Sequence, residues 1–506
     1  MIVPSLRLRG KCFGGAFLGI TGLLFLTVMA AYASSDDGNR DLDAKGNMIL
    51  PGPADRQITD ALAGITAPQV EHTIATLVTF HNRSTISSMD TDLPKGQGAS
   101  AAADWIESEL KRYSTECGGC LEVKRDTFIE PPQTGAHPRI VQPTTISNVY
   151  AILRGSDPAQ AKRMILVTGH YDSRNTDIMD SHGEAPGAND DASGVAVSLA
   201  CAHALSKLKL PATLVFVAVA GEEQGLNGSA HLAKLAKSEG WELEAVLNND
   251  IVGGNTTPGD TLQDKSAVRV FSESLPANAT PDEQRNLLRL GYESDSPSRE
   301  EARAIAEIAR TYEDALGPVQ SGAATASDFH PVLEFRPDRF LRGGDHSSFN
   351  QQGFAAVRFT EWREDFNHQH QNVRVENGVE YGDLLKFVDF NYVARVARLN
   401  AAVMASLALA PPPPAAVTVV VKDLDNNTTL HWRDGEGTPA GTGYEVVWRE
   451  LSAAGWQRSI SAGQGRSADG TWSITLPISK DNVIFGVRAV DGAGHRSPAV
   501  VPVPER

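Results

Sequence analysis

The chain has 506 residues, of which 41% are hydrophobic and 21% charged, and its formal net charge is -16 at pH 7. This length exceeds one ordinary domain, since domains commonly run to about 100–200 residues, and the composition supports a packed core rather than disorder. An acidic surface repels the phosphate backbone of DNA and RNA, so the charge argues against nucleic acid as a partner.

The N-terminus has the features of an export signal. Basic residues precede an apolar stretch at 13–31, and the small residues Ala31 and Ala33 offer a cleavage site before a polar segment. Residues 1–33 are therefore predicted to be a signal peptide, which makes the mature protein secreted or periplasmic, with no stable membrane insertion. An N-terminal membrane anchor is the alternative, because the apolar stretch approaches the roughly 20 residues that span a bilayer.

Residues 34–56 are polar, contain Gly and Pro, and are predicted to form a flexible lead-in to a first domain at 57–410. Three cysteines follow the signal: Cys117 and Cys120, spaced C-x-x-C, and Cys201. In an oxidising compartment, a local disulfide between Cys117 and Cys120 is the first expectation.

Short apolar runs alternate with helical patterns through the first domain. Strands are expected at 147–153, 164–168, 213–220, 245–247, 268–272 and 355–360, and helices at 101–113, 195–208, 229–238, 299–316 and 381–409. Apolar strands joined by crossover helices are typical of a mostly parallel or mixed sheet with helices on both faces. The fold class predicted for this domain is therefore α/β.

A run of four prolines opens a stiff linker at 411–415, after which the sequence changes character. Residues 416–506 consist of short β-prone runs separated by Gly, Asn and Asp, as expected for a small antiparallel sandwich. The stretches 444–449 and 485–491 resemble strands of fibronectin type III domains. We interpret this second domain as an attachment or spacing module, with cell wall or polymer as the surface it would contact.

Polar residues stand at the ends of several predicted strands, where ligands of open parallel sheets gather. Five such groups occur in chain order: Gly169-His170-Tyr171-Asp172-Ser173, Gly187-Ala188-Asn189-Asp190-Asp191-Ala192-Ser193-Gly194, Gly221-Glu222-Glu223-Gln224-Gly225, Asn249-Asp250 and Gly344-Asp345-His346-Ser347-Ser348-Phe349.

The chemistry of these groups favours a metal ion. His170 can supply an imidazole nitrogen while Asp172 accepts its other ring N–H. Glu222 and Glu223 would repel each other at the end of a very hydrophobic strand, and a cation removes that conflict. Each group alone also has a structural explanation, such as acids placed favourably at a helix N-terminus. Together they supply nitrogen and oxygen donors that suit zinc, with positions left open for water and substrate.

The order H-x-D, G-x-N-D-D-x-S-G, G-E-E-x-G-L-x-G-S, N-D and D-H-S-S-F, spread over about residues 145–405, resembles the co-catalytic zinc peptidases. That family includes secreted bacterial leucyl aminopeptidases and glutamate carboxypeptidase II. The resemblance implies the zinc exopeptidase fold, two zinc ions per chain and peptide substrates. The activity it implies first is that of an aminopeptidase, a hydrolase that removes N-terminal residues.

The resemblance also implies a role for each matching residue. Asp190 would bridge both zinc ions. His170 and Asp250 would complete the ligands of one ion, and Glu223 and His346 those of the other.

Two further carboxylates take catalytic roles in the same scheme: Glu222 as general base and Asp172 as the group that orients a histidine ligand. Two ions roughly 3.5–4 Å apart would share a water of lowered pKa. Glu222 would take its proton, the hydroxide would attack the scissile carbonyl, and the proton would pass to the leaving amine.

Three alternatives stay open on the sequence. A glutaminyl cyclase-like enzyme shares the fold but uses one zinc and lacks the first histidine ligand, so His170 argues against it. A carboxypeptidase of the same fold is compatible with the ligand set. A non-catalytic receptor-like module, as in transferrin receptor, would lack ligands or replace Glu222.

The residue preference at the cleavage site is expected to depend on loops that the motifs do not cover, at 254–299 and 327–342. Arg342, Arg363 and the Asn367-His368-Gln369-His370 cluster are interpreted as solvated loop residues, with the rim of the substrate pocket as the alternative.

Overall fold

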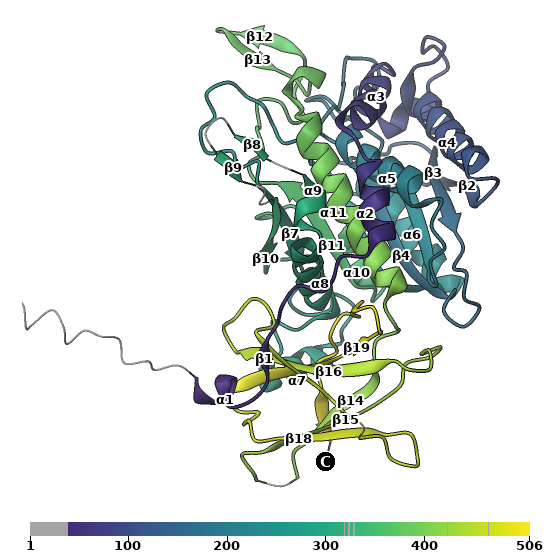
Figure 1. Ribbon diagram of the computed structural model, residues 1–506. Coiled ribbons are helices and arrows are strands. Elements are labelled where there is room, and N and C mark those ends of the chain that lie inside the picture. Colours follow the sequence, from purple (N-terminus) through teal and green to yellow (C-terminus); the bar gives the residue numbers. More distant parts are fainter. Residues whose placement is uncertain are drawn as a thin grey trace, which may run out of the picture. The chain divides into compact units, whose positions relative to one another are not determined.

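An eight-stranded mixed sheet organises the first domain in the computed structural model (Figure 1). The structure describes residues 39–317, 319–321, 324–326, 329–422, 424–463 and 465–505, so the predicted signal peptide lies outside the described residues. Within them, Asp41–Arg506 belong to one unit.

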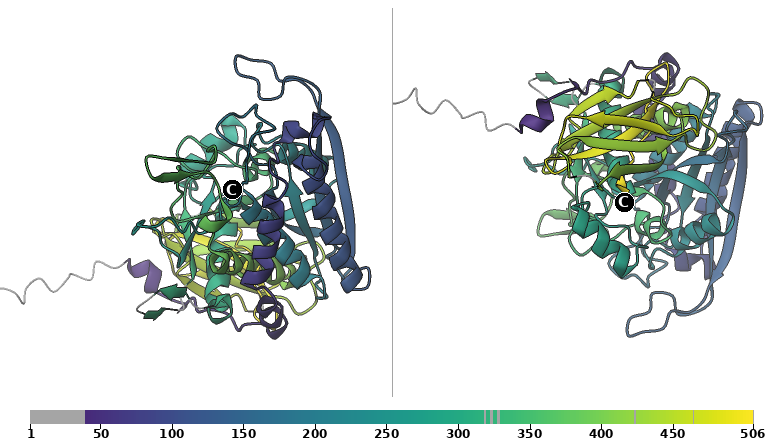
Figure 2. Two further views of the ribbon diagram at one scale, coloured as in Figure 1. Left: turned by 90° about the horizontal axis from the view of Figure 1, so that it is seen from above. Right: turned by 90° about the horizontal axis from the view of Figure 1, so that it is seen from below.

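The strand order is β10-β7-β11-β6-β4-β5-β3-β2. The strands are β2 (Leu121–Glu130), β3 (Thr144–Leu153), β4 (Arg163–His170), β5 (Thr213–Val219), β6 (Glu242–Asn249), β7 (Ala267–Ser272), β10 (His330–Glu334) and β11 (Ala356–Glu361). The four central strands β11, β6, β4 and β5 run parallel. Strand β3 pairs antiparallel with β5 and with β2, which forms one edge of the sheet (Figure 2).

Alternate side chains of the central strands enter two separate cores, because successive strand residues point to opposite faces. In β4, Ile165 and Val167 join the larger core, whereas Met164 and Leu166 join the smaller one. The larger core is covered by α2 (Arg56–Ala63), α3 (Ala67–Val78), α4 (Gly98–Glu116), α5 (Ala192–Leu205), α8 (Pro297–Thr311) and α11 (Phe390–Leu409). The smaller core is covered by α6 (Asn227–Ser238) and α10 (His346–Gln351).

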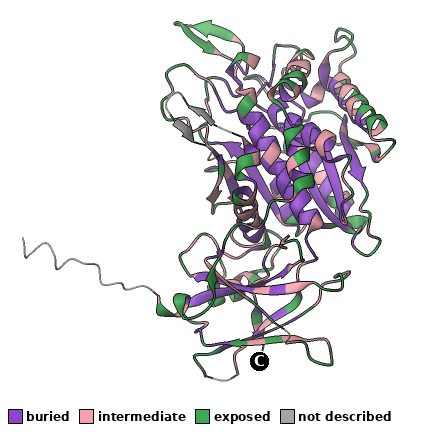
Figure 3. Ribbon diagram, in the orientation of Figure 1, coloured by how far each residue is buried: buried purple, intermediate pink, exposed green. Residues whose placement is uncertain are grey.

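Every residue of β4 and β5 is buried, which is visible as the purple centre of Figure 3. Burial on both faces is what near-continuous apolar runs predict for parallel strands. The α/β fold class is therefore confirmed.

The remaining elements connect or flank these layers. They are α1 (Arg40–Asp43), β1 (Asn47–Met48), η1 (Thr85–Met89), α7 (Pro281–Leu290), α9 (Glu313–Leu316), β8 (Val319–Ser321), β9 (Ala324–Ala326), β12 (Arg374–Glu376), β13 (Val379–Tyr381) and η2 (Leu385–Phe387). Cys117 and Cys120 form the expected local disulfide, and Cys201 is a buried free thiol.

Helix α11 begins at Phe390, later than predicted, because the Asp389 carboxylate accepts hydrogen bonds from the backbone N–H groups of Asn391 and Tyr392 and caps the helix. Among the described helices, α11 has the length and hydropathy of a membrane span, but 89% of its apolar window is buried inside the protein. It is therefore the central core helix of this fold.

Two four-stranded sheets follow the prolines, in the orders β1-β17-β16-β19 and β18-β15-β14-β20. Their strands are β14 (Ala415–Val420), β15 (Thr428–Arg433), β16 (Gly443–Glu450), β17 (Arg458–Ser461), β18 (Trp472–Leu476), β19 (Val483–Val490) and β20 (Val503–Glu505). A core of their own includes Trp432, Trp448 and Phe485.

Part of the segment that was predicted to be a flexible lead-in belongs to this core instead. Strand β1 pairs antiparallel with β17, and Leu42 is buried among the residues of the β core. The indole N–H of Trp448 donates to the Leu42 carbonyl at 2.9 Å. A buried indole needs a hydrogen-bond acceptor, and this polar segment provides it.

A buried network of charges joins the α8 region to the β sheets. The Asp295 side chain is fully buried, and its Oδ1 lies 2.5 Å from Nη2 of Arg449 and 3.4 Å from Nη1 of Arg303. Trp456 Nε1 donates to Glu300 at 3.0 Å, and burial raises the pKa of Glu300 to about 7. The carboxylate of Asp295 thus forms ion pairs with two buried guanidinium groups from distant parts of the chain.

We expect Asp295→Asn to destabilise the protein strongly, because it leaves Arg303 and Arg449 buried with less compensating charge. Removing one partner of a buried ion pair typically costs about 3–5 kcal/mol. Glu380→Gln is the matched control: Glu380 lies 2.6 Å from Lys386, both side chains are about half exposed, and such pairs contribute about 0–1 kcal/mol. Urea unfolding measures both variants, and equal midpoints would show that the buried network contributes little.

Candidate metal centre

Polar side chains converge where the central parallel strands end. His170 is the last residue of β4, Glu222 and Glu223 lie in the turn after β5, and Asp250 follows β6 directly. Because β4 lies between β5 and β6, the sheet itself brings these side chains together at one edge. Asp190 joins them from the loop that leads into α5.

Asp190 lies between two histidines. Its Oδ1 is 3.1 Å from Nε2 of His170, and its Oδ2 is 3.0 Å from Nε2 of His370. Each carboxylate oxygen therefore faces a different imidazole. This is the arrangement expected of a carboxylate that bridges two adjacent cations.

Two groups of metal-ligating atoms surround this carboxylate. In the first, one donor atom each from His170, Glu222 and Asp250 lie within 4.8 Å of one another. In the second, donor atoms of Asp190, Glu223 and His370 meet the same criterion, and Nε2 of His370 is 3.0 Å from Oε1 of Glu223.

Asp172 lies against the far side of the His170 ring. Nδ1 of His170 is 3.3 Å from Asp172 Oδ1 and 3.1 Å from the Asp172 carbonyl. The Thr85 hydroxyl donates to Asp172 Oδ2 at 2.9 Å and fixes the carboxylate in turn. With Nδ1 held in this way, Nε2 is the ring nitrogen presented to the cluster.

Asp191, the neighbour of Asp190, takes a structural role. Its Oδ1 accepts from the Gly194 N–H at 2.8 Å and caps α5, and its Oδ2 accepts from the His170 N–H at 2.9 Å. The residue therefore ties the N-terminus of α5 to the end of β4, which positions Asp190 and His170 relative to each other.

The structure places His346 away from both ligand groups, so its predicted position at the centre is wrong. His346 is the first residue of α10, and its Nε2 lies 2.8 Å from the Pro337 carbonyl and 3.7 Å from Asp338. The D-H-S-S-F motif instead forms a helix whose Phe349 enters the smaller core. The imidazole is buried against its own loop, and neither group of metal-ligating atoms around Asp190 includes it.

His370 occupies the place expected for His346. It belongs to the cluster that was interpreted as solvated loop residues, and its neighbour His368 is buried and stacks on Phe387 with ring centroids 3.7 Å apart. Gln369 Nε2 donates to Asp190 Oδ2 at 3.1 Å. The loop after β11 is therefore anchored by the two residues directly before His370.

Asp383 is a further residue that the sequence did not single out. Its carboxylate accepts from the backbone N–H of Asp190 at 2.7 Å and from that of Asn189. Burial raises the pKa of Asp383 to about 7. The hydrogen bonds orient the peptide that carries the central carboxylate, and no strand pattern or motif spacing marks such a residue in advance.

The electrostatics of the cluster call for positive charge. Burial opposes the charged form of His370, but Glu223 and Asp190 outweigh it and raise the pKa of His370 to about 10. Burial raises the pKa of Glu222 well above its usual value, and the neighbouring carboxylates Asp250 and Glu223 add to the shift. Without metal ions, His370 and Glu222 therefore retain protons. Metal cations at the same place would compensate the carboxylates instead.

The donor set fits zinc. Buried Oε1 of Glu223 has no hydrogen-bond partner among the described residues, although it faces the His370 ring. Two imidazoles with shared carboxylates match the mixed nitrogen and oxygen ligands of catalytic zinc sites.

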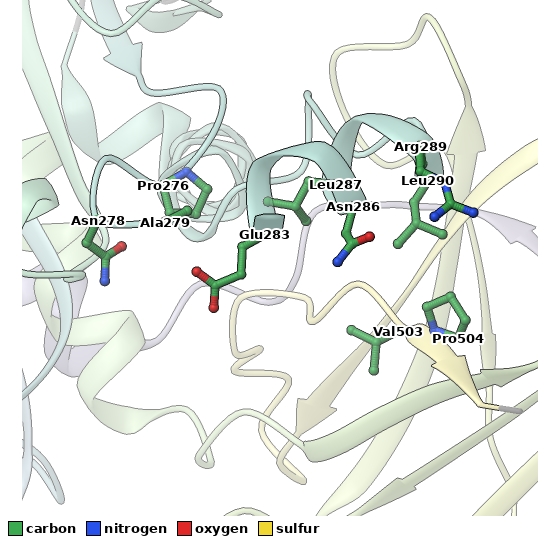
Figure 4. A pocket seen from close by; sticks show the side chains of 10 residues that line it. All are labelled: Pro276, Asn278, Ala279, Glu283, Asn286, Leu287, Arg289, Leu290, Val503 and Pro504. Carbon is green, nitrogen blue, oxygen red and sulfur yellow. The ribbon is translucent and has the colours of Figure 1, made fainter. Parts of the chain in front are cut away.

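The cluster opens into a cavity of about 630 Å³, lined in part by Asp190, Glu222, Glu223, Asp250 and His370. A cavity of similar size lies between α7 and β20 (Figure 4), and its lining includes Leu287, Leu290 and Val503. That second cavity has Glu283 as its one carboxylate and no histidine or cysteine among its lining residues. Its lining therefore lacks the donors of a metal centre.

Comparison with known proteins identifies the family of this chain. The model of peptidase family M28 matches residues 148–375. The chain is 41% identical over 462 residues to a probable zinc metalloprotease of Pyrenophora teres f. teres, covering 91% of this chain and 89% of the relative. It is 42% identical over 466 residues to a probable zinc metalloprotease of Pyricularia oryzae, covering 91% and 87%.

Solved structures with a similar fold are more distant. The LapA aminopeptidase of Legionella pneumophila aligns with a TM-score of 0.47 and 18% identity, covering 72% of this chain and 79% of that chain. The glutaminyl cyclase of Porphyromonas gingivalis aligns with a TM-score of 0.43 and 17% identity, covering 67% and 98%.

We expect His370→Gln to lower the zinc content of the purified protein, because it removes an imidazole beside Asp190 and Glu223. His346→Gln is the matched control and should keep the wild-type zinc content, since its ring contacts Pro337 and Asp338 instead. Elemental analysis of the folded fraction from gel filtration measures both. Loss of zinc from His346→Gln alone would restore the assignment that the sequence favoured.

Proposed function

We propose, from the premise that the chain belongs to peptidase family M28 and is a zinc metalloprotease, that it is a secreted exopeptidase with aminopeptidase activity. The observation that carries the proposal is Asp190, whose two carboxylate oxygens face His170 and His370 at 3.1 and 3.0 Å. Two donor groups that share one carboxylate suit a pair of metal ions, which is the arrangement that the resemblance to co-catalytic zinc peptidases implies.

We infer two zinc ions per chain. His170 and Asp250 would hold one ion, Glu223 and His370 the other, and Asp190 both. When bound, zinc would lower the pKa of a water molecule and polarise the scissile carbonyl.

Glu222 is the residue suited to proton transfer. It lines the cavity and is half-buried, whereas its neighbour Glu223 is buried against His370. In this assignment Glu222 is not a metal ligand, so its carboxylate stays free to accept a proton. Glu222 takes a proton from the attacking water and returns it to the leaving amine, which is general base followed by general acid catalysis.

The carboxylates of the cavity support the aminopeptidase assignment over a carboxypeptidase. Asp190, Glu222, Glu223 and Asp250 all face the same space, and the α-ammonium of an unblocked peptide is attracted to such surroundings. A carboxypeptidase of the same fold is the second candidate, favoured by arginines that line the same cavity.

Export and the C-terminal module complete the proposal. The signal-like residues 1–33 favour a secreted or periplasmic protein, with an N-terminal membrane anchor as the alternative. We retain peptidase and fibronectin type III-like domains at 57–410 and 416–506, supported by their separate hydrophobic cores. The second domain would attach the enzyme to cell wall or polymer.

Glu222→Gln and Glu223→Gln are neighbouring substitutions that should fail in different ways. Glu222→Gln keeps the shape of the side chain but cannot accept a proton, so kcat should fall by roughly 10²–10⁴-fold, with KM little changed and zinc retained. Glu223→Gln should lower zinc affinity and recover in part at high zinc. Metal content and kcat on a chromogenic amino acid anilide measure both, and loss of zinc from Glu222→Gln alone would reverse the two roles.

We expect metal-replete protein to contain two zinc ions per chain, since Asp190 faces two separate donor groups. A chelator should abolish peptidase activity, and zinc should restore it. Elemental analysis and titration of the chelated protein with zinc measure the stoichiometry. A single tightly held zinc would favour the glutaminyl cyclase-like alternative.

A further inference from the structure

Four arginines line the cavity that contains the metal centre: Arg139, Arg174, Arg339 and Arg342. They come from three loops, which follow β2, β4 and β10. The chain as a whole carries a net charge of -16, so this gathering of positive charge is local.

Two of the arginines share buried carboxylates. Arg339 is buried, and its guanidinium lies 3.0 Å from Asp338 and 2.9 Å from Glu364. Arg342 also meets Glu364, at 2.8 Å, as does Arg269 at 3.2 Å. The carboxylate of Glu364 is therefore shared by three guanidinium groups. It cannot neutralise all three, so positive charge remains at the cavity wall.

Arg139 is held by a backbone carbonyl. Its Nη1 donates to the Glu223 carbonyl at 2.8 Å, and in the described part of the chain no carboxylate oxygen lies within 4.0 Å of its guanidinium. The side chain is thus placed beside a proposed zinc ligand, with donors left over on the exposed side.

Arg174 is held in the same manner. Its Nε donates to the Asn175 carbonyl at 3.0 Å and its Nη2 to the Thr176 carbonyl at 3.1 Å. Among the described residues it also has no carboxylate within ion-pairing distance. Carbonyl acceptors fix the direction of a guanidinium without neutralising its charge.

Arg139 and Arg174 form no ion pair with the metal-site carboxylates among the described residues, whereas other arginines are paired. Arg358 is fully buried and pairs with Asp250 at 2.8 Å, and Arg339 pairs with Asp338 and Glu364. The two arginines without carboxylate partners among the described residues, Arg139 and Arg174, line the cavity. Their charge is available to a ligand.

We propose that Arg139, Arg174 and Arg342 bind a carboxylate of the peptide substrate and make the enzyme selective for acidic substrates. The inference rests on the proposed function and names the substrate class of that same site. A guanidinium matches a carboxylate through two parallel N–H···O bonds, a geometry that neutral side chains do not reproduce. The carboxylate comes from an N-terminal Asp or Glu side chain or from the C-terminus of a short peptide.

The test compares paired substrates on the zinc-loaded enzyme. One arm uses glutamyl and glutaminyl anilides, and the other uses short peptides with a free or an amidated C-terminus. A charged hydrogen bond contributes about 1.5–3 kcal/mol, so the substrate with the carboxylate should have a kcat/KM about 10–100-fold higher in one arm. The arm that responds identifies which carboxylate is bound.

Arg174→Gln and Arg139→Gln should each reduce that ratio at least several-fold. Arg363→Gln is the matched control: Arg363 is an exposed arginine paired with Asp260 at 3.1 Å and does not line the cavity. The control should leave the ratio unchanged. A ratio near one in both arms, or a ratio that survives both cavity variants, overturns the proposal.

Failure of the proposed function gives a different result. If N-blocked peptides lose C-terminal residues while aminoacyl anilides are not cleaved, the aminopeptidase assignment is wrong and the carboxylate subsite stands. If neither class is cleaved, calorimetry of free L-glutamate against L-glutamine on wild type and both variants decides. Equal affinities for the two amino acids then overturn the carboxylate subsite.

Discussion

The structure depends on the placement of four carboxylates, Asp190, Glu222, Glu223 and Asp250, in one partly buried space. Burying carboxylates costs free energy unless charge or hydrogen bonds compensate them, and like charges at close range add to that cost. Histidines at both oxygens of Asp190 and the buried Arg358 beside Asp250 supply part of the compensation. Divalent cations supply the remainder most directly, and the geometry of the cluster follows from that need.

The fold meets this constraint through ordinary properties of a parallel sheet. Strands β4, β5 and β6 are neighbours that run in one direction, so their carboxyl ends deliver His170, the Glu222–Glu223 pair and Asp250 to one edge. The capped N-terminus of α5 then places Asp190 above them. The burial of β4 and β5 along their whole length makes these positions rigid, because packed interiors allow little adjustment.

The difference between residues at strand ends and residues in loops explains which site residues the sequence predicted and which it missed. His170, Glu223 and Asp250 each follow an apolar strand, and strand ends in a parallel sheet have a known location relative to one another. His370 lies in a loop whose position depends on tertiary contacts, such as Gln369 with Asp190 and His368 with Phe387. His346 has the same residue type in a motif-like setting, so sequence alone favoured it.

The roles of the lead-in segment and of Asp383 also depend on contacts between distant parts of the chain. Leu42 lies in a polar segment, and only the partner indole of Trp448, far along the chain, makes it a core residue. The effect of Asp383 on Asp190 acts through backbone N–H groups, which carry no sequence signal. Element types and strand-end chemistry were therefore predictable, whereas contacts between distant loops were not.

The negatively charged and the positively charged residues of the cavity come from different parts of the fold. The carboxylates and histidines come mostly from strand ends and the start of α5, where the backbone is buried and rigid. The arginines come from loops, and Arg139 and Arg174 are held by backbone carbonyls rather than by other side chains. Loops tolerate substitution and insertion better than the strands they connect. We therefore expect changes in these arginine-bearing loops to alter substrate preference with less effect on the proposed ligands at the strand ends.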